Sequence, residues 1–360
     1  MDKDTLFFSK LLIPWYLTNR RELPWRNVQS PYKVWLSEVI LQQTRVAQGL
    51  PYYERFISHF PTIEDLANAT EEKVLLLWQG LGYYTRARNL HAAAKYVVNE
   101  RNGIFPKTHK ELLKLKGVGD YTASAIASIC FDEPQPVVDG NVYRFLSRFF
   151  GLETIVPSPK AHKEFKELSK KLMGKEAPGT FNQAMMEFGA LQCVPKNPNC
   201  NICVFSTRCI ALQKNKVEDL PIKKKKIKVK KRYFNYFVAT DNNKKEILIQ
   251  KRMKKDIWYK LFQLPLLETE SSLDILQLRE TISTHADFNG MDRDSIQLIN
   301  SQEIVHKLTH QHLYTKFWKI KFLSPHFEAI SINRLEEFAF PTLIEDFLSE
   351  YLEELIINSN

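Results

Sequence analysis

The feature that most constrains the fold is the lysine-rich run LPIKKKKIKVKKR at residues 220–232. It has no apolar face of useful width, so it predicts a linker that can lie on phosphates rather than a segment of a packed core. Before this run, apolar residues recur at helical spacing, with Pro and Gly marking the breaks. The clearest stretches are 34–41, 64–78, 111–130 and 141–150.

After the lysine-rich run the period changes. YFNYFVAT, EILIQKR and TKFWKIKFL alternate or run apolar over strand-like lengths, and a final helix is expected near 341–356. The chain has 360 residues, more than one compact core usually takes. We therefore predict a mainly α region over 1–213, a basic linker over 214–232 and a separate α+β domain over 233–360.

The formal net charge of +10 is distributed unevenly. Residues 1–213 carry 27 basic and 20 acidic side chains, residues 214–232 carry 10 and 2, and the remainder is acidic overall. This indicates that the first two segments face a polyanion, although a solvated surface would account for the charge equally well. The mixed charge of the first four residues and the absence of a long apolar run favour a cytoplasmic protein without a membrane partner.

Four of the five cysteines lie close together in the sequence: Cys193, Cys200, Cys203 and Cys209, with six, two and five residues between successive members. In an intracellular chain such a group argues against a disulfide framework. The spacing alone allows either an iron–sulfur cluster or a structural zinc ion. Cys130 stands among Ala, Ile and Phe, which predicts a buried apolar filler.

The segment LLKLKGVGDYTASAI at residues 112–126 combines a glycine turn with the start of a helix. Gly117 and Gly119 permit a tight turn whose free N–H groups can hold a DNA phosphate without regard to sequence. This is the helix-hairpin-helix arrangement. An ordinary turn is the alternative for an isolated Gly-x-Gly, but the leading leucines and the helical TASAIASI favour the hairpin.

Two carboxylates stand in segments that suggest chemistry. Asp139 precedes a Gly-Asn turn and a helix in VVDGNVYRFLSR, where an N-cap is its commonest use. Glu38 lies in WLSEVILQQ, and taken alone it would be a solvent-facing helical residue. Its neighbours Val39, Ile40 and Leu41 give it an apolar environment instead.

Several further motifs accompany these: LPWR, PYKVWLSEVILQQTRV, GLGYYTRARNLHAAA and FNQAMMEFGALQC. Together the motifs resemble the MutY-type adenine DNA glycosylases of the endonuclease III (helix-hairpin-helix) superfamily. The resemblance implies two helical subdomains with an iron–sulfur loop at 193–209, followed by a Nudix-like α+β domain. It also implies a 4Fe-4S cluster held by the four grouped cysteines. We expect a monomer acting on double-stranded DNA that contains an adenine mispair, associated with the nucleoid if the source is bacterial.

The resemblance also implies catalytic roles. Glu38 would protonate the adenine ring, because adenine leaves poorly until a ring nitrogen carries a proton. Asp139 would stabilise the sugar cation or attack it transiently, as in sugar hydrolysis. Tyr121 and Asn141 would tune and position Asp139. Relatives that also cut the strand carry a lysine where this chain has Tyr121, so strand cleavage is not expected, with the nearby Lys116 as a reservation.

Adenine must leave the helical stack to reach these carboxylates. The resemblance implies one set of residues around the extruded base and another touching the duplex near an oxidised guanine; each of these residues alone could instead belong to the core or the surface. The first set is Trp25, Arg26 and Gln183, and the second is Leu41, Gln43, Thr44 and Tyr83.

In the family a short loop of aromatic, Ser and His residues checks for oxidised guanine, and the matching residues here are Leu308, Thr309 and His310. The hydroxyl and the imidazole are present, while the aromatic is absent. The domain lacks the closely spaced acidic ligands of a Nudix hydrolase, so nucleotide hydrolysis is not expected. Two other readings remain: an endonuclease III-like enzyme for oxidised pyrimidines, and a DNA-binding module without catalysis.

Overall fold

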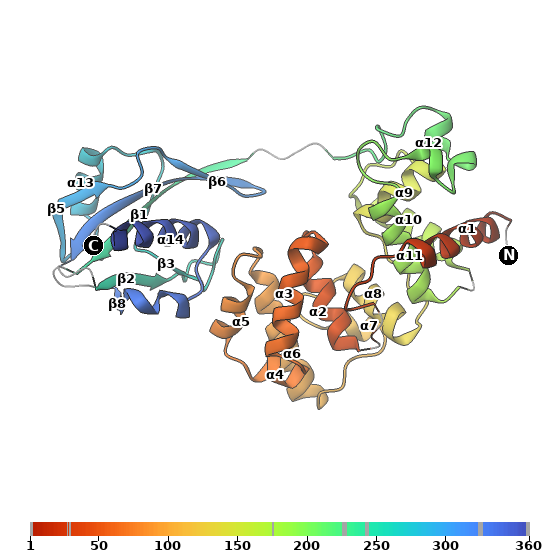
Figure 1. Ribbon diagram of the computed structural model, residues 1–360, viewed down its shortest axis with the longest axis horizontal. Coiled ribbons are helices and arrows are strands. Elements are labelled where there is room, and N and C mark those ends of the chain that lie inside the picture. The colour runs from red at the N-terminus through yellow and green to blue at the C-terminus, as the bar shows by residue number, and fades with distance from the viewer. Residues whose placement is uncertain are drawn as a thin grey trace. The chain divides into compact units, whose positions relative to one another are not determined.

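The computed structural model describes residues 3–26, 28, 30–174, 176–224, 229–241, 245–322 and 327–357 (Figure 1). The chain divides into two compact units. The first contains residues 1–68 and 89–225, and the second contains residues 69–88 and 226–360. Each unit is described by itself below.

The first unit is helical, and its helices begin where the sequence supplies caps. Ser30 caps α2 and Ser158 caps α10, and each is followed by a proline at the first helical position. Asp139 caps α9 in the same way. The helices are α1 (Lys3–Asn19), α2 (Pro31–Leu41), α3 (Val46–His59), α4 (Ile63–Asn68), α6 (Thr85–Arg101, mostly in this unit), α7 (His109–Leu112), α8 (Asp120–Phe131), α9 (Gly140–Phe150), α10 (Pro159–Met173), α11 (Pro178–Leu191) and α12 (Ile210–Gln213), with short 3-10 turns at Cys200–Ile202 and Ser206–Arg208.

An aromatic core joins α1, α9 and α11 to the segment that carries the cysteines. Phe145 lies at its centre, with its ring centroid 4.3 Å from that of Phe188 and 5.4 Å from that of Phe8. Phe205, between two of the cysteines, is 1% exposed and packs on Phe188 at 5.1 Å. Burial of these large rings fixes α9 and α11 against the cysteine segment.

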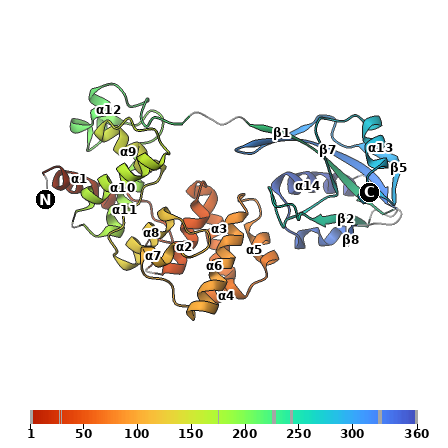
Figure 2. The ribbon, with the colours of Figure 1, turned by 180° about the vertical axis from the view of Figure 1, so that it is seen from behind.

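The second unit is built on a mixed sheet in which β1 (Lys230–Thr240) runs parallel to β7 (Gln311–Phe322). These two strands lie side by side in both views (Figure 1, Figure 2). The sheet order is β3-β2-β1-β7-β5, with β4 beside β1, β6 beside β7 and β8 beside β2. The other elements are α5 (Glu71–Trp78), β2 (Glu246–Lys251), β3 (Phe262–Gln263), β4 (Leu266–Thr269), α13 (Ile275–Ser283), β5 (Met291–Leu298), β6 (Ile304–Lys307), β8 (Glu328–Ser331) and α14 (Thr342–Ile357), with 3-10 turns at Ala286–Phe288 and Ile332–Glu337.

The two faces of this sheet bury separate cores. On one face Phe317 stacks on Phe347 of α14, with ring centroids 3.6 Å apart. On the other, Trp318 packs in a cluster with Leu278 and Ile282 of α13. The two-residue period of a strand places neighbours such as Phe317 and Trp318 on opposite faces, so both faces of β7 are apolar in its middle. The prediction of an α+β fold after the helical region is confirmed, and the second compact unit also includes residues 69–88.

Most of the predicted elements are present, with two differences. The stretch expected to be helical over 64–78 is divided, because the Thr70 hydroxyl accepts from the Lys73 N–H and starts a new helix. The lysine-rich run is not a free linker throughout, since Leu220 is buried and Lys223 forms a parallel bridge with Val156. Residues 230–232 of this run already belong to β1, while 225–228 lie outside the described residues.

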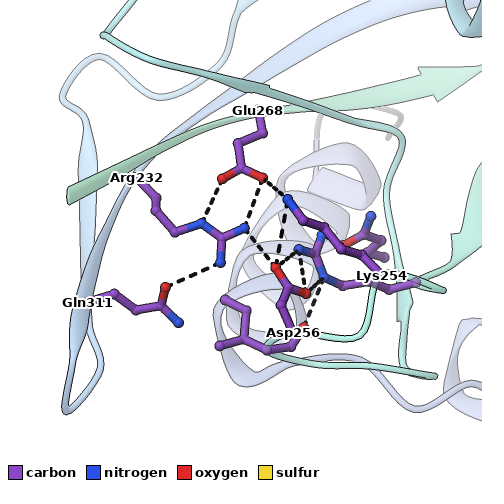
Figure 3. Close-up of polar contacts among 8 residues, drawn as sticks. Arg232, Lys254, Asp256, Glu268 and Gln311 are labelled. Atoms are coloured by element: carbon purple, nitrogen blue, oxygen red, sulfur yellow. Dashed lines mark hydrogen bonds and ion pairs between the residues drawn. The ribbon is translucent and has the colours of Figure 1, made fainter. Parts of the chain in front are cut away.

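A network of ion pairs holds the start of β1 in place (Figure 3). The buried Arg232 guanidinium donates to Glu268 at 2.7 Å and to Asp256 at 2.9 Å. Its third nitrogen donates to Gln311 at 3.2 Å. Arg252 also donates to Asp256, at 2.8 Å. Because the two buried arginines each have hydrogen-bonded carboxylate partners, the network holds β1 against its neighbours.

In the described part of the chain, no helix is both long enough and apolar enough to cross a membrane.

Candidate active site and cysteine pocket

A pocket in the first unit brings together residues that are far apart in the sequence. It is lined by α2, α8, α9, α11 and the segment before α2. Among its lining residues are nine that the sequence analysis singled out: Trp25, Arg26, Glu38, Leu41, Thr44, Tyr121, Asp139, Asn141 and Gln183.

Glu38 faces this pocket from α2. Burial raises the pKa of its carboxyl to about 7, the hydrogen bond with Tyr121 acts in the opposite direction, and the nearby Asp139 charge adds to the rise. The Tyr121 hydroxyl also lies 3.3 Å from the sulfur of Met186. A carboxyl with a pKa near 7 can carry a proton at neutral pH and give it up to a substrate.

Asp139 is held rigidly at the start of α9. Its Oδ1 accepts from the backbone N–H groups of Asn141 and Val142 at 2.9 and 2.8 Å, and its Oδ2 accepts from the Asn141 side chain at 2.7 Å. Burial raises the pKa of Asp139, and these three hydrogen bonds oppose that rise because they favour the charged form. Asp139 therefore caps α9, as the sequence predicts, and also lines the pocket.

Arg144, on the first turns of α9, was not singled out from the sequence. Its guanidinium donates to the Asn141 side-chain oxygen at 2.9 Å, to the Cys193 carbonyl at 2.6 Å and to the Gly189 carbonyl. It thus joins the partner of Asp139 to the first residue of the cysteine group. Its position three residues after Asn141 on one helix face was the available signal.

Glu187 is a second residue that the sequence analysis missed. It is 1% exposed and lies between two arginines, with Arg21 and Arg26 nitrogens each 2.6 Å from its Oε2. Burial alone would raise the pKa of Glu187, but the hydrogen bonds from both arginines outweigh it and bring the pKa to about 2. Arg26 therefore has a fixed position on the pocket wall rather than a free side chain.

The predicted hairpin lies outside the pocket lining. Gly117 has φ +78°, and a Cβ at this position would lie 2.7 Å from the Cβ of Asn89, so only glycine fits there. Gly119 is the N-cap of α8, and a Cβ there would meet open space. The open side at Gly119 leaves room for a phosphate near the helix N-terminus.

The remaining predicted DNA contacts are not among the residues that line this pocket. Gln43 and Tyr83 both adopt a positive φ, which is uncommon for residues other than glycine. Within the second unit, the Tyr83 hydroxyl lies 2.8 Å from the Thr309 hydroxyl, and His310 lines the same surface pocket as both. Leu308 packs partly against the core and does not project freely.

The four grouped cysteines line one largely apolar pocket in the first unit, beside Phe145, Phe188 and Phe205. None of them is in a disulfide. Arg148, 2% exposed, points a nitrogen at the Cys193 sulfur at 3.5 Å and donates to the Val194 and Pro195 carbonyls. In the described residues no group of three or more His, Cys, Asp or Glu side chains is arranged to hold a single metal ion.

A set of four thiols around one pocket with a cationic neighbour suits a multi-atom cluster, whose ligands spread wider than those of one ion. Thiolates are the usual ligands of an iron–sulfur cluster, so this donor set fits the cluster that the resemblance implies.

Comparisons with known proteins place the chain in a family. Residues 36–173 match the HhH-GPD superfamily of base excision DNA repair proteins, and residues 235–350 match the NUDIX domain. The adenine DNA glycosylase of Buchnera aphidicola subsp. Schizaphis graminum is 39% identical over 73% of this chain and 76% of its own length. That of Buchnera aphidicola subsp. Baizongia pistaciae is 36% identical over 86% and 85%, and that of Homo sapiens is 42% identical over 59% and 41%.

Solved structures agree on the helical fold. A thermostable thymine-DNA glycosylase is 29% identical with a TM-score of 0.55, covering 59% of this chain and 98% of its own. A trapped endonuclease III–DNA covalent intermediate, at 23% identity and a TM-score of 0.52, covers 60% of this chain and 99% of its own and shares the fold. With the helical region and the sheet domain both as predicted, the chain belongs to the MutY-type adenine DNA glycosylases, within the HhH-GPD superfamily of base excision DNA repair proteins.

Proposed function

We propose that this protein hydrolyses the N-glycosidic bond of adenine mispaired with 8-oxoguanine or guanine in duplex DNA, without cutting the strand. The observation that carries the proposal is the pair of carboxyls in one pocket, Glu38 and Asp139, held in different environments. One is partly buried with its pKa raised to about 7, and the other accepts three N–H hydrogen bonds. In such a pair, the protonated carboxyl can act as the acid while the charged carboxylate stabilises a positive charge.

Glu38 acts as the general acid. At neutral pH a substantial fraction of its carboxyl carries the proton, which it gives to a ring nitrogen of the extruded adenine so that the base can leave as a neutral molecule. Tyr121 contributes as the polar neighbour of Glu38 in the pocket, where it opposes the rise in the pKa of that carboxyl.

Asp139 faces the sugar. As the bond to the base breaks, positive charge develops on the deoxyribose, and an anionic carboxylate near it stabilises that charge or bonds to it briefly before water completes the hydrolysis. Asn141 holds one carboxylate oxygen and the helix N–H groups hold the other, so Asp139 need not reorganise during the reaction.

The absence of a strand-cutting step follows from the residue at position 121. Schiff-base formation needs an amine near the sugar, and Tyr121 places a hydroxyl in the pocket instead. Lys116 is exposed and is not part of the pocket lining.

We propose that contacts outside the pocket hold and inspect the duplex. The hairpin at Gly117 and Gly119 would bind a phosphate, and Trp25, Arg26 and Gln183 would surround the extruded adenine, with Leu41 and Thr44 at the pocket edge. Gln43, Tyr83, Thr309 and His310 would contact the duplex near the oxidised guanine. The hydrogen bond between the Tyr83 and Thr309 hydroxyls supports a shared role for these two residues.

We further propose that Cys193, Cys200, Cys203 and Cys209 hold a 4Fe-4S cluster. When bound it would supply structural rigidity to the loop between the first two cysteines, which carries Lys196 toward DNA. The domain boundaries at 1–213, 214–232 and 233–360, and a monomeric state on duplex DNA, belong to the same proposal.

The test is base release from three duplexes, carrying adenine opposite 8-oxoguanine, adenine opposite guanine, or an oxidised pyrimidine, each scored with and without hot alkali. Alkali-dependent cleavage of the adenine strand is expected, and it should be abolished by Glu38→Gln but retained by Glu22→Gln, an exposed carboxylate of the same region. Cleavage without alkali at the oxidised pyrimidine would refute the proposal and assign the enzyme to the lyase branch.

A further inference from the structure

A strip of basic and aromatic side chains, partly or fully exposed, lies on one face of the second unit's sheet. Lys231 and Tyr233 alternate on β1, and the directly paired residues of β7 are His312 and Tyr314. Lys307 of β6 is paired with His312 and shares the same face. We call these five residues the tyrosine strip.

The geometry of the strip is fixed by interactions within it and beneath it. The Tyr233 and Tyr314 rings are stacked with centroids 5.3 Å apart, and the Lys231 ammonium lies 5.6 Å from the Tyr314 centroid. On the opposite face of β1, Arg232 is bound into the ion-pair network of Figure 3. Because side chains alternate along a strand, the buried Arg232 requires Lys231 and Tyr233 to point outward.

The strip is the part of this face that α13 leaves uncovered. Farther along the same face, Phe237 and Trp318 are buried in the core beneath α13. At the other end of this face, Lys231 on β1 and Lys307 on β6 are exposed, and the two tyrosines are partly exposed. Partly exposed rings next to exposed lysines on an otherwise well-packed sheet suggest a binding surface.

The charge of the strip indicates which kind of partner it binds. The neighbouring register positions on this face are occupied by Thr269 opposite Tyr233 and Val305 opposite Tyr314. None of these paired positions carries a carboxylate, so the lysines are not neutralised by residues directly across the strands. Lysine ammonium and tyrosine hydroxyl groups are donors that proteins commonly direct at DNA phosphates.

The position of the strip supports the same partner. The Lys230 N–H donates to the His310 carbonyl at 3.0 Å, and the Leu308 N–H donates to the Gln311 carbonyl at 2.8 Å. The strip therefore continues directly from the β6–β7 loop that contains Thr309. A duplex inspected by this loop would extend past it onto the face that the strip occupies.

We propose that the tyrosine strip binds the phosphate backbone of duplex DNA beside the inspected base pair, with Lys231 and Lys307 as the charged contacts and the tyrosine hydroxyls as neutral donors. This proposal requires that the protein bind DNA, but it does not require that the protein release adenine. It therefore extends the proposed function without depending on Glu38.

The test measures the affinity of the full-length protein for a labelled undamaged duplex by fluorescence anisotropy at several salt concentrations. Each lysine–phosphate contact contributes about one unit to the slope of log K against log salt. Lys231→Ala should weaken binding and reduce that slope by about 1, and Lys231→Ala with Lys307→Ala should reduce it by about 2. Tyr314→Phe should weaken binding with an unchanged slope, because it removes a donor and no charge.

Lys321→Ala is the matched control, since Lys321 is an exposed lysine at the far end of β7 from the strip. It should leave both affinity and slope as in the wild type. A slope for Lys231→Ala equal to that of Lys321→Ala would overturn the proposal and point to a protein rather than DNA on this surface. A second arm uses a duplex with adenine opposite 8-oxoguanine in a Glu38→Gln background. Equal affinity for the two duplexes would count against the proposed lesion recognition, while the lysine effects would still report on the strip.

Discussion

Replacing Glu38 by glutamine should stabilise the protein, and the gain should depend on pH. Folding raises the pKa of this carboxyl from its usual 4.5 to about 7, mainly through burial. The folded state therefore favours the protonated form, so the wild type loses stability as pH rises from about 4.5 through about 7. Each pKa unit corresponds to about 1.4 kcal/mol, so the full loss is about 3 kcal/mol.

The amide of Glu38→Gln has a similar shape and does not titrate in this range. The free energy of unfolding of the variant minus that of the wild type should therefore increase by about 2 to 3 kcal/mol between about pH 5 and pH 8. Urea unfolding followed by far-ultraviolet circular dichroism, which reports on the helices of the first unit, measures it. Glu22→Gln, at an exposed carboxylate, should show no such increase. A difference for Glu38→Gln that stays constant over this range would refute the claim that burial holds the proton on this residue.

Four further outcomes are expected. Single-turnover release of adenine should fall as pH rises through about 7, because the proton on Glu38 is then lost; a profile that rises through pH 7 would contradict the acid role. Arg144→Gln should slow base release by about tenfold with unchanged DNA affinity, since the charge-assisted hydrogen bond to Asn141, worth about 1.5 kcal/mol, is lost beside Asp139, along with those to the Cys193 and Gly189 carbonyls. Glu187→Gln should lower the free energy of unfolding by about 2 kcal/mol, as two arginines lose their carboxylate and one of them is partly exposed; urea titration checks it. Cys203→Ser should reduce the iron content and the visible absorption of the purified protein, measured by metal analysis and spectroscopy.

The local patterns of the sequence predicted most of the architecture. The switch from a helical period to alternation marked the two kinds of fold, and the capping residues Ser30, Thr70 and Ser158 stand where the structure starts α2, α5 and α10. These features are local, because a cap or a periodic apolar face depends on residues within a few positions of one another. Leu220 shows where this reasoning stops, since it is buried by contacts with distant parts of the chain.

The sequence by itself determined which motifs are present: the carboxylates at 38 and 139, the glycines of the hairpin, and the cysteine spacing. Only the tertiary structure decided that Glu38 is buried enough to hold a proton near pH 7, that Arg144 connects the partner of Asp139 to Cys193, and that Glu187 fixes Arg26. The physical reason is that pKa values and buried ion pairs depend on desolvation and on charges brought together from distant segments, which no local pattern records.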